Sequence, residues 1–274
     1  MKQNKTNYIT GLLTLSPNAT TRYIASKSKC TPQMVNYVRR NMEQPKQNDS
    51  IVGFFTDIHE PGCHPRFFEF VRDTFRANNV TTVICGGDLV DHHFISRHVS
   101  EPDALNPVNE LEVAIKHLEK WTKEFPEVLC CTGNHDSIPV RQAKELGIPT
   151  NFLKSLNAVY GLPKGWIWDN QYEVDGVLYE HGLAANGMYG VKNLALAYRQ
   201  SVCVGHTHSY AGVYFVASPK DIIFGLNGGC GIDTASYASR YSVPYKFKPS
   251  LGCSIIINGK EPRFIPMDMD KYRR

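Results

Sequence analysis

The stretch Val83-Ile84-Cys85-Gly86-Gly87-Asp88-Leu89-Val90-Asp91-His92-His93 decides the fold and places its chemistry. An apolar run ends in two glycines and an acid, and a second acid and two histidines follow. This pattern predicts a buried strand that stops at a tight turn and presents Asp88 at its carboxyl end. Open α/β sheets carry their functional residues at that end.

Three further apolar runs stop in the same way, each at a short polar block. The blocks are Asp57-Ile58-His59, Gly133-Asn134-His135-Asp136 and Gly205-His206-Thr207-His208, and a fifth block contains His181. Strand and helix patterns alternate from residue 51 to 204, and strand patterns dominate after 208. We therefore expect an α/β fold, a four-layer αββα sandwich of two mixed sheets with helices outside, preceded by a small all-α piece.

The composition is that of an ordinary globular protein. The chain has 274 residues, of which 42% are hydrophobic and 20% charged. Neither an apolar run long enough to cross a membrane nor a signal peptide is recognisable, so we expect a cytoplasmic protein that does not bind membranes. The eight scattered cysteines form no CxxC pair, which predicts reduced thiols rather than disulfides or a zinc finger.

The first 47 residues are strongly basic. They carry eight lysines and arginines and a single glutamate, a net charge of +7, which leaves −3 for the remainder because the whole chain carries +4. Two helices are expected within residues 18–42, separated by a turn at Ser28-Lys29-Cys30. Thr31 is the predicted N-cap of the second helix, and Pro32 suits its first position.

This arrangement resembles the helix-turn-helix of DNA-binding regulators, although Lys29 stands where the turn usually has glycine. The resemblance implies that the second helix enters the major groove of DNA. Its candidate DNA contacts are Gln33, Asn36, Arg39 and Arg40. The alternative is a basic helical cap that packs on the main domain or on a partner protein. The polar residues 43–50 read as a linker, so we expect domains at 1–47 and 48–274.

The polar residues at the strand ends suit a pair of divalent cations that accept imidazole and carboxylate ligands. These residues are Asp57, His59, Asp88, Asn134, His135, His181, His206 and His208. Two neighbouring cations need a shared ligand, and Asp88 on its central strand is the best candidate for that carboxylate. So many buried charges without cations would cost too much free energy.

In this order, the five blocks resemble the calcineurin-like metallophosphoesterase superfamily, whose pattern is DxH, GDxxD, GNH(D/E), H and GHxH. The resemblance covers roughly residues 51–257 and implies two divalent cations, with manganese first and iron, zinc or nickel as alternatives. It assigns Asp57, His59 and His208 to one cation. It assigns Asn134, His181 and His206 to the other, with Asp88 as the bridge.

The same resemblance implies a hydroxide between the cations as the nucleophile. His135 would stabilise the transition state or protonate the leaving oxygen, and Asp91 would orient the His135 ring. Asp136 has two open interpretations, a support for the ligands or a cap for the helix that starts near Ile138. His117 is expected on an exposed helical face.

The substrate is constrained by His92 and His93, which stand where Ser/Thr protein phosphatases of the superfamily have arginine and glycine. This departure disfavours the protein-phosphatase branch. The combination of Asp91-His92-His93, Ser96-Arg97-His98 and Gly228-Gly229-Cys230-Gly231 looks more like phosphoesterases of phages and prophages, which would act in the host cytoplasm. Candidate substrate contacts are His92, Arg97 and His98 on the loop after Asp91, with Arg141 as a further phosphate clamp. A solvated loop is the alternative.

A basic DNA-binding piece on a phosphoesterase predicts a metal-dependent DNA phosphodiesterase, that is, a nuclease. The alternative is a phosphomonoesterase or a small- or cyclic-nucleotide phosphodiesterase whose helical N-terminus is a docking module. A binding protein on a degenerate scaffold is disfavoured by the complete ligand set. A helix-turn-helix suggests a dimer on DNA, but no other feature of the sequence bears on the oligomeric state.

Overall fold

A computed structural model describes residues 9, 12–13, 19–43, 49–96, 101–236 and 246–273. Contacts divide the chain into two compact units, Met1–Asp49 and Ser50–Arg274. Each unit is described by itself below. Among the described helices, none combines the length and the apolar character that a membrane crossing needs.

The N-terminal unit contains helices α2 (Thr21–Ser28) and α3 (Pro32–Glu43). Between them Lys29 adopts the left-handed conformation, with φ 50° and ψ 44°, which is the conformation that glycine usually supplies at a helix end. The two helices share a small apolar core, whose buried members are Ile9, Leu13, Ile24, Ala25, Val35 and Val38.

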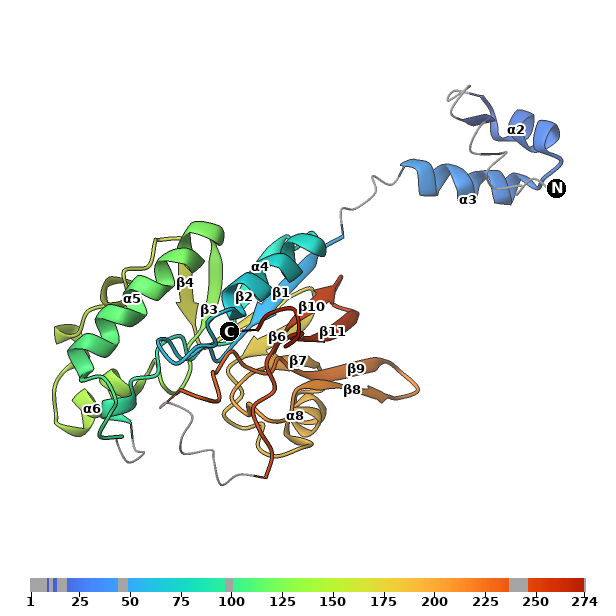
Figure 1. Ribbon diagram of the computed structural model, residues 1–274. Coiled ribbons are helices and arrows are strands. Elements are labelled where there is room, and N and C mark those ends of the chain that lie inside the picture. Colours follow the sequence, from blue (N-terminus) through green and yellow to red (C-terminus); the bar gives the residue numbers. More distant parts are fainter. Residues whose placement is uncertain are drawn as a thin grey trace. The chain divides into compact units, whose positions relative to one another are not determined.

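Two mixed sheets form the centre of the larger unit (Figure 1). The first sheet has the order β11-β10-β1-β2-β3-β4, in which β1 to β4 are mutually parallel, β10 pairs antiparallel with β1, and β11 pairs antiparallel with β10. Its strands are β1 (Ile51–Phe55), β2 (Thr82–Cys85), β3 (Val128–Cys131), β4 (Trp166–Asp169), β10 (Gly252–Ile257) and β11 (Glu261–Pro266).

The second sheet has the order β5-β6-β7-β9-β8. Its three inner strands are parallel, and β5 and β8 run antiparallel at the edges. The strands are β5 (Gln171–Val174), β6 (Val177–Glu180), β7 (Ser201–Val204), β8 (Gly212–Ala217) and β9 (Ile222–Asn227).

Helices cover the outer face of each sheet (Figure 1). The buried face of α4 (Phe67–Ala77) and of α5 (Pro107–Glu124) packs on the first sheet, and α8 (Gly190–Tyr198) packs on the second. The shorter helices are α6 (Ile138–Glu145), α7 (Leu156–Tyr160) and the 3₁₀ turns η1 (His93–Ile95) and η2 (Thr150–Phe152). The expected four-layer sandwich is therefore confirmed.

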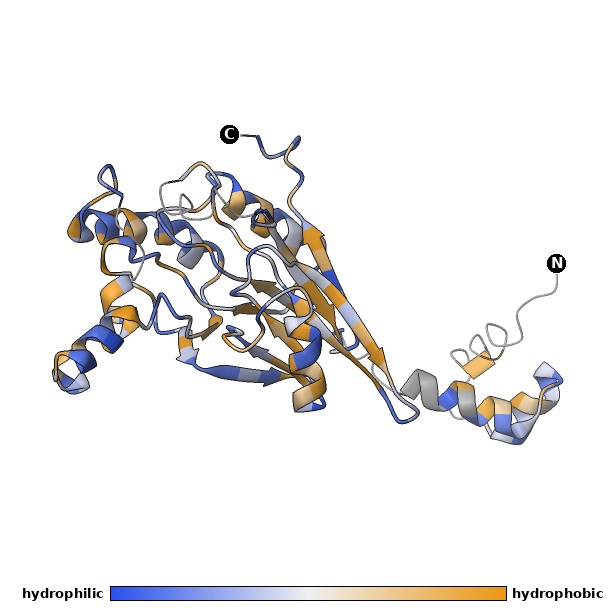
Figure 2. Cartoon of the chain, turned by 90° about the horizontal axis from the view of Figure 1, so that it is seen from below, coloured by the Kyte–Doolittle hydropathy of each residue, from blue (hydrophilic) through white to orange (hydrophobic). Residues whose placement is uncertain are grey.

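Adjacent phenylalanines of β1 show how the layers are held together. Successive strand residues point to opposite faces of a sheet. Phe54 packs between the sheets, with its ring centroid 5.9 Å from that of Tyr179, and Phe55 packs outward on Trp121 of α5 at 4.7 Å. Figure 2 shows hydrophobic residues concentrated on the strands inside this unit. Burial of each aromatic ring contributes about 1.5–3 kcal/mol.

Two local features of the fold depend on contacts that periodicity does not reveal. Helix α4 begins at Phe67, and the backbone N–H of His64, just before it, donates to the Gly231 carbonyl (2.8 Å). Helix α7 has five residues, with Ser155 as its N-cap, and was not expected because so short a segment gives no periodic pattern.

Candidate metal centre

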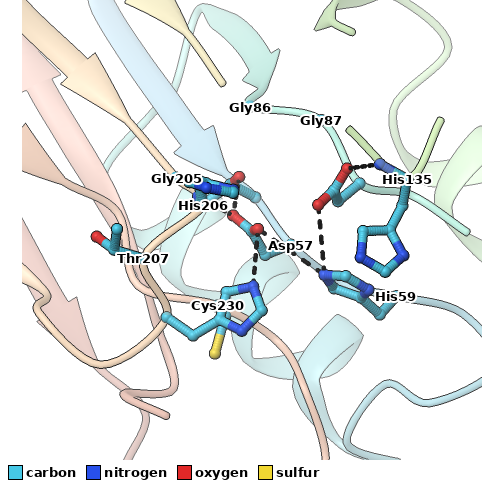
Figure 3. A network of polar contacts seen from close by, with 12 residues as sticks. Asp57, His59, Gly86, Gly87, His135, Gly205, His206, Thr207 and Cys230 are labelled. Atoms are coloured by element: carbon cyan, nitrogen blue, oxygen red, sulfur yellow. Dashed lines mark hydrogen bonds and ion pairs between the residues drawn. The ribbon is translucent and has the colours of Figure 1, made fainter. Parts of the chain in front are cut away.

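The polar blocks meet because the strands that carry them are parallel. β1, β2 and β3 lie side by side in the first sheet, and β6 and β7 lie side by side in the second. The carboxyl ends of neighbouring parallel strands share one edge of a sheet. Figure 3 shows Asp57 and His59 directed toward one another, with the ring of His135 beside that of His59. One cluster therefore collects side chains from both sheets.

Four candidate ligands have a left-handed backbone conformation. The φ angles are 52° for Asp57, 47° for His59, 56° for Asp88 and 65° for His206. Residues other than glycine adopt positive φ rarely, and such strain gathers at functional sites. Backbone hydrogen bonds between the loops stabilise this conformation. The N–H of Asp57 donates to the Gly87 carbonyl and the N–H of His59 donates to the Asp88 carbonyl, each at 3.0 Å.

The first predicted ligand set is assembled in the structure. Asp57, His59 and His208 each offer one ligand atom, and these atoms lie within 4.8 Å of one another. The Nε2 atom of His208 is 3.0 Å from Asp57 Oδ1, and that of His59 is 3.8 Å from the same oxygen. Asp57 is fully buried. These three residues can hold one cation.

The second set lies around His181. Asp57, Asp88 and His181 form a further group of ligand atoms within 4.8 Å. His181 Nε2 is 3.3 Å from Asp88 Oδ2 and 2.8 Å from Asn134 Oδ1, and its ring lies 5.1 Å from that of His206. The same Asp88 oxygen is 3.6 Å from His59 Nε2. Asp88 thus lies between the two groups, as a bridge must, and Asp57 is common to both as well.

The histidine rings are oriented for metal binding. The Nδ1–H of His59 donates to Asp91 Oδ1 at 2.7 Å, and that of His181 donates to the Gly86 carbonyl at 2.8 Å. Metal-binding histidines are usually fixed in this way through the second ring nitrogen. The Nε2 atom of His59 is buried and has no hydrogen-bond partner among the described residues. A cation would satisfy that atom, so the residues present fit the metal.

The electrostatics of the cluster also demand positive charge. Burial lowers the pKa of His181, but the carboxylates of Asp88 and Asp57 outweigh it and raise the pKa to about 10. Burial raises the pKa of Asp57, but the hydrogen bond from His208 and the charges of His208 and His181 outweigh it and hold the pKa well below its usual value. Positive charge beside these buried carboxylates is therefore favourable, and divalent cations can supply it.

Two glycines leave room for the carboxylates. A Cβ on Gly133 would lie 2.0 Å from Asp88 Oδ1, and a Cβ on Gly205 would lie 2.1 Å from Asp57 Oδ2. Both distances are far below van der Waals contact. A side chain at either position would displace a candidate ligand.

Asp136 joins two of the loops. Its buried carboxylate accepts hydrogen bonds from the backbone N–H groups of Asp88 (2.7 Å), Leu89 (3.1 Å) and Gly133 (3.0 Å). Burial and the charge of Asp88 raise its pKa to about 7. Of the two open interpretations, this geometry favours the support of the ligands, since Asp136 fixes the backbone on both sides of Asp88 and before Asn134.

His135 lies beside the cluster without belonging to either predicted ligand set. Its Nδ1 bonds the backbone carbonyl of Asp91, and its ring centroid lies 4.5 Å from that of His59. The Asp91 carboxylate is 3.4 Å from His135 Nδ1 but only 2.7 Å from His59 Nδ1. Asp91 therefore orients His135 mainly through its backbone carbonyl, and its carboxylate orients His59. This corrects the expectation that Asp91 acts on the His135 ring alone.

The candidate substrate contacts are only partly brought to the centre. His92 is buried, and its Nε2 lies 2.8 Å from Tyr160 Oη, so its ring is engaged inside the fold rather than offered to a substrate. Arg97 and His98 lie outside the described residues. Arg141 is exposed on α6.

Two further histidines have buried acidic neighbours that the sequence did not indicate. His93 is buried, as His92 is, and its Nδ1 lies 3.7 Å from Asp91 Oδ2. The backbone N–H of His93 donates a hydrogen bond to Glu110 Oε1. His117 is not simply solvated, because its Nδ1 lies 2.7 Å from the carboxylate of Glu60. The repeated His92-His93 block was the one sequence signal for such a network.

The candidate DNA contacts are partly engaged within their own unit. Asn36 accepts a hydrogen bond from Thr21 (2.9 Å), and Arg39 donates to the carbonyl of Ala19. Gln33 is exposed. The side chain of Arg40 lies outside the described part of the chain.

Comparison with protein families identifies the class. The family model for the calcineurin-like phosphoesterases matches residues 51–220, which include all five polar blocks. The chain belongs to this family. With the ligand set described above, it is a metal-dependent phosphoester hydrolase. No curated protein sequence matches the chain.

Solved structures share the general arrangement at low similarity. Vacuolar protein sorting 29 from Cryptosporidium parvum is 11% identical, with a TM-score of 0.40 over 80% of this chain and 98% of that one. YfcE, a phosphoesterase from E. coli, is 17% identical, with a TM-score of 0.36 over 80% of this chain and all of that one. The family assignment therefore depends on the family model and not on these structures.

Proposed function

We propose that the protein is a metal-dependent DNA phosphodiesterase. The observation that carries the hydrolytic part is the paired ligand groups around Asp57 and Asp88, with His135 beside them. The observation that supports DNA is the net charge of +7 on residues 1–47. Neutralising phosphates with basic residues supplies most of the non-specific affinity for DNA.

Metal binding and proton transfer are assigned to different residues of the chain. Asp57, His59 and His208 would hold one cation, and Asn134, His181 and His206 the other, with Asp88 shared. When bound, the cations supply Lewis acidity, which activates water and neutralises the phosphate oxygens. The Nδ1 of His135 faces a carbonyl acceptor and so carries a proton. Its Nε2 is the ring atom left to exchange a proton with the leaving oxygen.

The experiment is a manganese-supplemented activity panel on the full chain. It compares bis-p-nitrophenyl phosphate, p-nitrophenyl phosphate, cyclic nucleotides, and single- and double-stranded DNA. We expect cleavage of the diesters and of DNA, and none by the Asp88→Asn protein. Intact DNA in a reaction that hydrolyses the small diester would refute the nuclease.

A phosphomonoesterase or small-nucleotide phosphodiesterase is the second candidate. The internal hydrogen bonds of Asn36 and Arg39 favour it, because they occupy two side chains that DNA contact would require. In that case residues 1–47 form a docking module for a protein partner. The panel separates the two candidates, since this one predicts turnover of small esters without DNA binding.

Manganese is the cation to add first, with iron, zinc or nickel as alternatives, because mixed imidazole and carboxylate ligands suit all of them. A phage-type origin, a cytoplasmic location and a dimer on DNA stay predictions from the sequence.

A further inference from the structure

A pocket adjoins the metal centre at His181 and has no part in the hydrolytic step. Its volume is about 300 Å³, at the lower end of the range of about 300–1,000 Å³ for small-molecule sites. It lies where the chain passes from the first sheet to the second. The lining residues that matter here are Asn170, Gln171, Glu180, Leu183 and Tyr198.

The polar wall of the pocket is built by two paired strands and the end of a helix. Gln171 of β5 and Glu180 of β6 are partners across the antiparallel ladder, so their side chains lie on the same face of the sheet. The hydroxyl of Tyr198 in α8 donates to Glu180 Oε2 at 3.4 Å. An amide, a carboxylate and a tyrosine thus converge on one small volume beside a candidate metal ligand.

The charges of the wall exclude a phosphate. Among the described residues that line the pocket, none is lysine or arginine, and Glu180 would repel an anion. Cations bound at the metal centre, which the pocket adjoins at His181, would supply the positive charge for a phosphate. The pocket therefore suits an uncharged, hydrogen-bonding part of a molecule whose phosphate lies at the metals.

Two of the lining side chains also offer exposed apolar surface. Leu183 is 57% exposed and Tyr198 is 44% exposed, although both line the pocket. Apolar and aromatic side chains beside a few polar groups are typical of the lining of small-molecule sites. A flat ring with polar edges fits this combination, since amide and carboxylate groups pair with base edges and an aromatic side chain stacks on the base.

We propose that this pocket binds the nucleobase of the nucleotide whose phosphate is hydrolysed at the metal centre. The inference rests on the proposed phosphoesterase function and names the part of the substrate that the protein recognises. Gln171 and Glu180 read the edge of the base, and Tyr198 and Leu183 cover its face. The pocket selects nucleotide esters over other phosphoesters.

Two chromogenic diesters test the proposal on the full chain with manganese. Thymidine 5′-(p-nitrophenyl phosphate) carries a base, bis-p-nitrophenyl phosphate does not, and both release p-nitrophenol. The quantity to compare is kcat/KM for the thymidine ester divided by kcat/KM for bis-p-nitrophenyl phosphate. We expect Gln171→Ala and Tyr198→Ala each to lower this ratio about tenfold, the size of effect seen when alanine substitution removes a base contact. An unchanged ratio in both variants would overturn the subsite.

Glu173→Ala is the matched control. Glu173 is exposed, lies two residues along β5 on the same face as Gln171, and does not line the pocket. Its substitution should leave the ratio unchanged. A drop as large as that of Gln171→Ala would mean that the strand, and not the pocket, controls the ratio, and would overturn the assignment.

Direct binding separates failure of the subsite from failure of the proposed function. If the wild type hydrolyses neither ester, the phosphoesterase is refuted, and calorimetric titration with thymidine 5′-monophosphate still decides the subsite. We expect Gln171→Ala to weaken thymidine monophosphate binding about tenfold and deoxyribose 5-phosphate binding less. Equal weakening of both ligands would place the sugar in the pocket and overturn the base assignment.

Discussion

The two units of the chain differ in how their polar residues are held. In the larger unit, Asp57 and Asp88 are almost fully buried at strand ends, beside histidines oriented through their Nδ1 atoms. In the N-terminal unit, Gln33 and Asn36 are exposed on a helix surface. Buried charges cost free energy unless cations or partners balance them, whereas exposed polar groups cost nothing.

Because of this difference, the structure indicates a function for the larger unit more clearly than for the N-terminal unit. The burial of several carboxylates and imidazoles in one place is itself evidence for metal, since packing alone does not explain it. The charge of the helical unit is compatible with DNA, with a protein partner or with simple solvation. The function of the helical unit must therefore be tested by binding, whereas substitution of the buried residues is expected to have the largest effects on activity.

Among substitutions in the buried cluster of the larger unit, Asp88→Asn is expected to have the largest effect. The carboxylate lies beside His59 and His181, one from each ligand group, so its loss should weaken both metal sites. We expect kcat/KM for bis-p-nitrophenyl phosphate to fall at least about a thousandfold, or about 4 kcal/mol of transition-state stabilisation. The protein should also retain less manganese after gel filtration, as measured by elemental analysis.

The exposed Asp268 provides the control. Asp268→Asn makes the same chemical change outside the cluster, where the side chain accepts hydrogen bonds from the backbone N–H groups of Asp270 and Lys271. Its activity should equal that of the wild type. Full activity of Asp88→Asn with a normal metal content would contradict the shared-ligand assignment.

His135→Ala should separate metal binding from proton transfer. His135 lies in the cluster but outside both predicted ligand sets, and loss of a general acid costs about 10²–10⁴-fold in rate. We expect kcat to fall by that factor while the manganese content stays at the wild-type level. Loss of metal together with rate would show that His135 acts as a ligand.

The sequence could predict which residues meet, because polar residues that directly follow parallel strands must lie at one edge. Asp57, His59 and Asp88 come together for that reason at the first sheet, and His181 and His208 follow parallel strands of the second sheet and meet them there. It could also predict the layers, since the alternation of strands and helices leaves few ways to bury both faces of each sheet.

The detailed contacts could not be predicted, because they depend on backbone conformation in short loops. Asp91 directs its carboxylate to His59 and its carbonyl to His135, a choice set by the turns around Asp88 and His92, both with positive φ. The partner of His92 is Tyr160, which lies 68 residues away in the unexpected helix α7.

Removal of residues 1–49 tests whether the N-terminal unit binds DNA. The larger unit is compact by itself, so a chain of residues 50–274 should keep its turnover of bis-p-nitrophenyl phosphate within about twofold. With the basic residues gone, we expect duplex DNA affinity to fall at least about tenfold and to depend less steeply on salt. Fluorescence anisotropy from about 50 to 200 mM salt measures both quantities.

Equal DNA affinity of the two chains would remove the DNA-binding assignment of the N-terminal unit. Weak binding by both, with normal turnover of the small diester, would favour the docking module. In that case the buried cluster of the larger unit would carry all of the chemistry.

The smallest expected effect concerns a buried acid that is not a candidate ligand. Glu110 is 2% exposed, and burial raises its pKa from the ordinary value of 4.5 to about 7. Below pH 4.5 the group is protonated in both the folded and the unfolded chain. Between pH 4.5 and 7 the unfolded chain loses the proton first, so the free energy of unfolding falls as the pH rises.

Glu110→Gln removes this dependence and can still accept the hydrogen bond from the His93 backbone, now through an amide oxygen. The difference in stability between variant and wild type should therefore be near zero at pH 4.5 and grow toward pH 8 in favour of the variant. The upper limit is about 3 kcal/mol, and a melting-temperature difference of several degrees is expected. A difference that does not change with pH would show that Glu110 ionises normally in the folded protein, and that burial at this position is not as costly as at the strand ends.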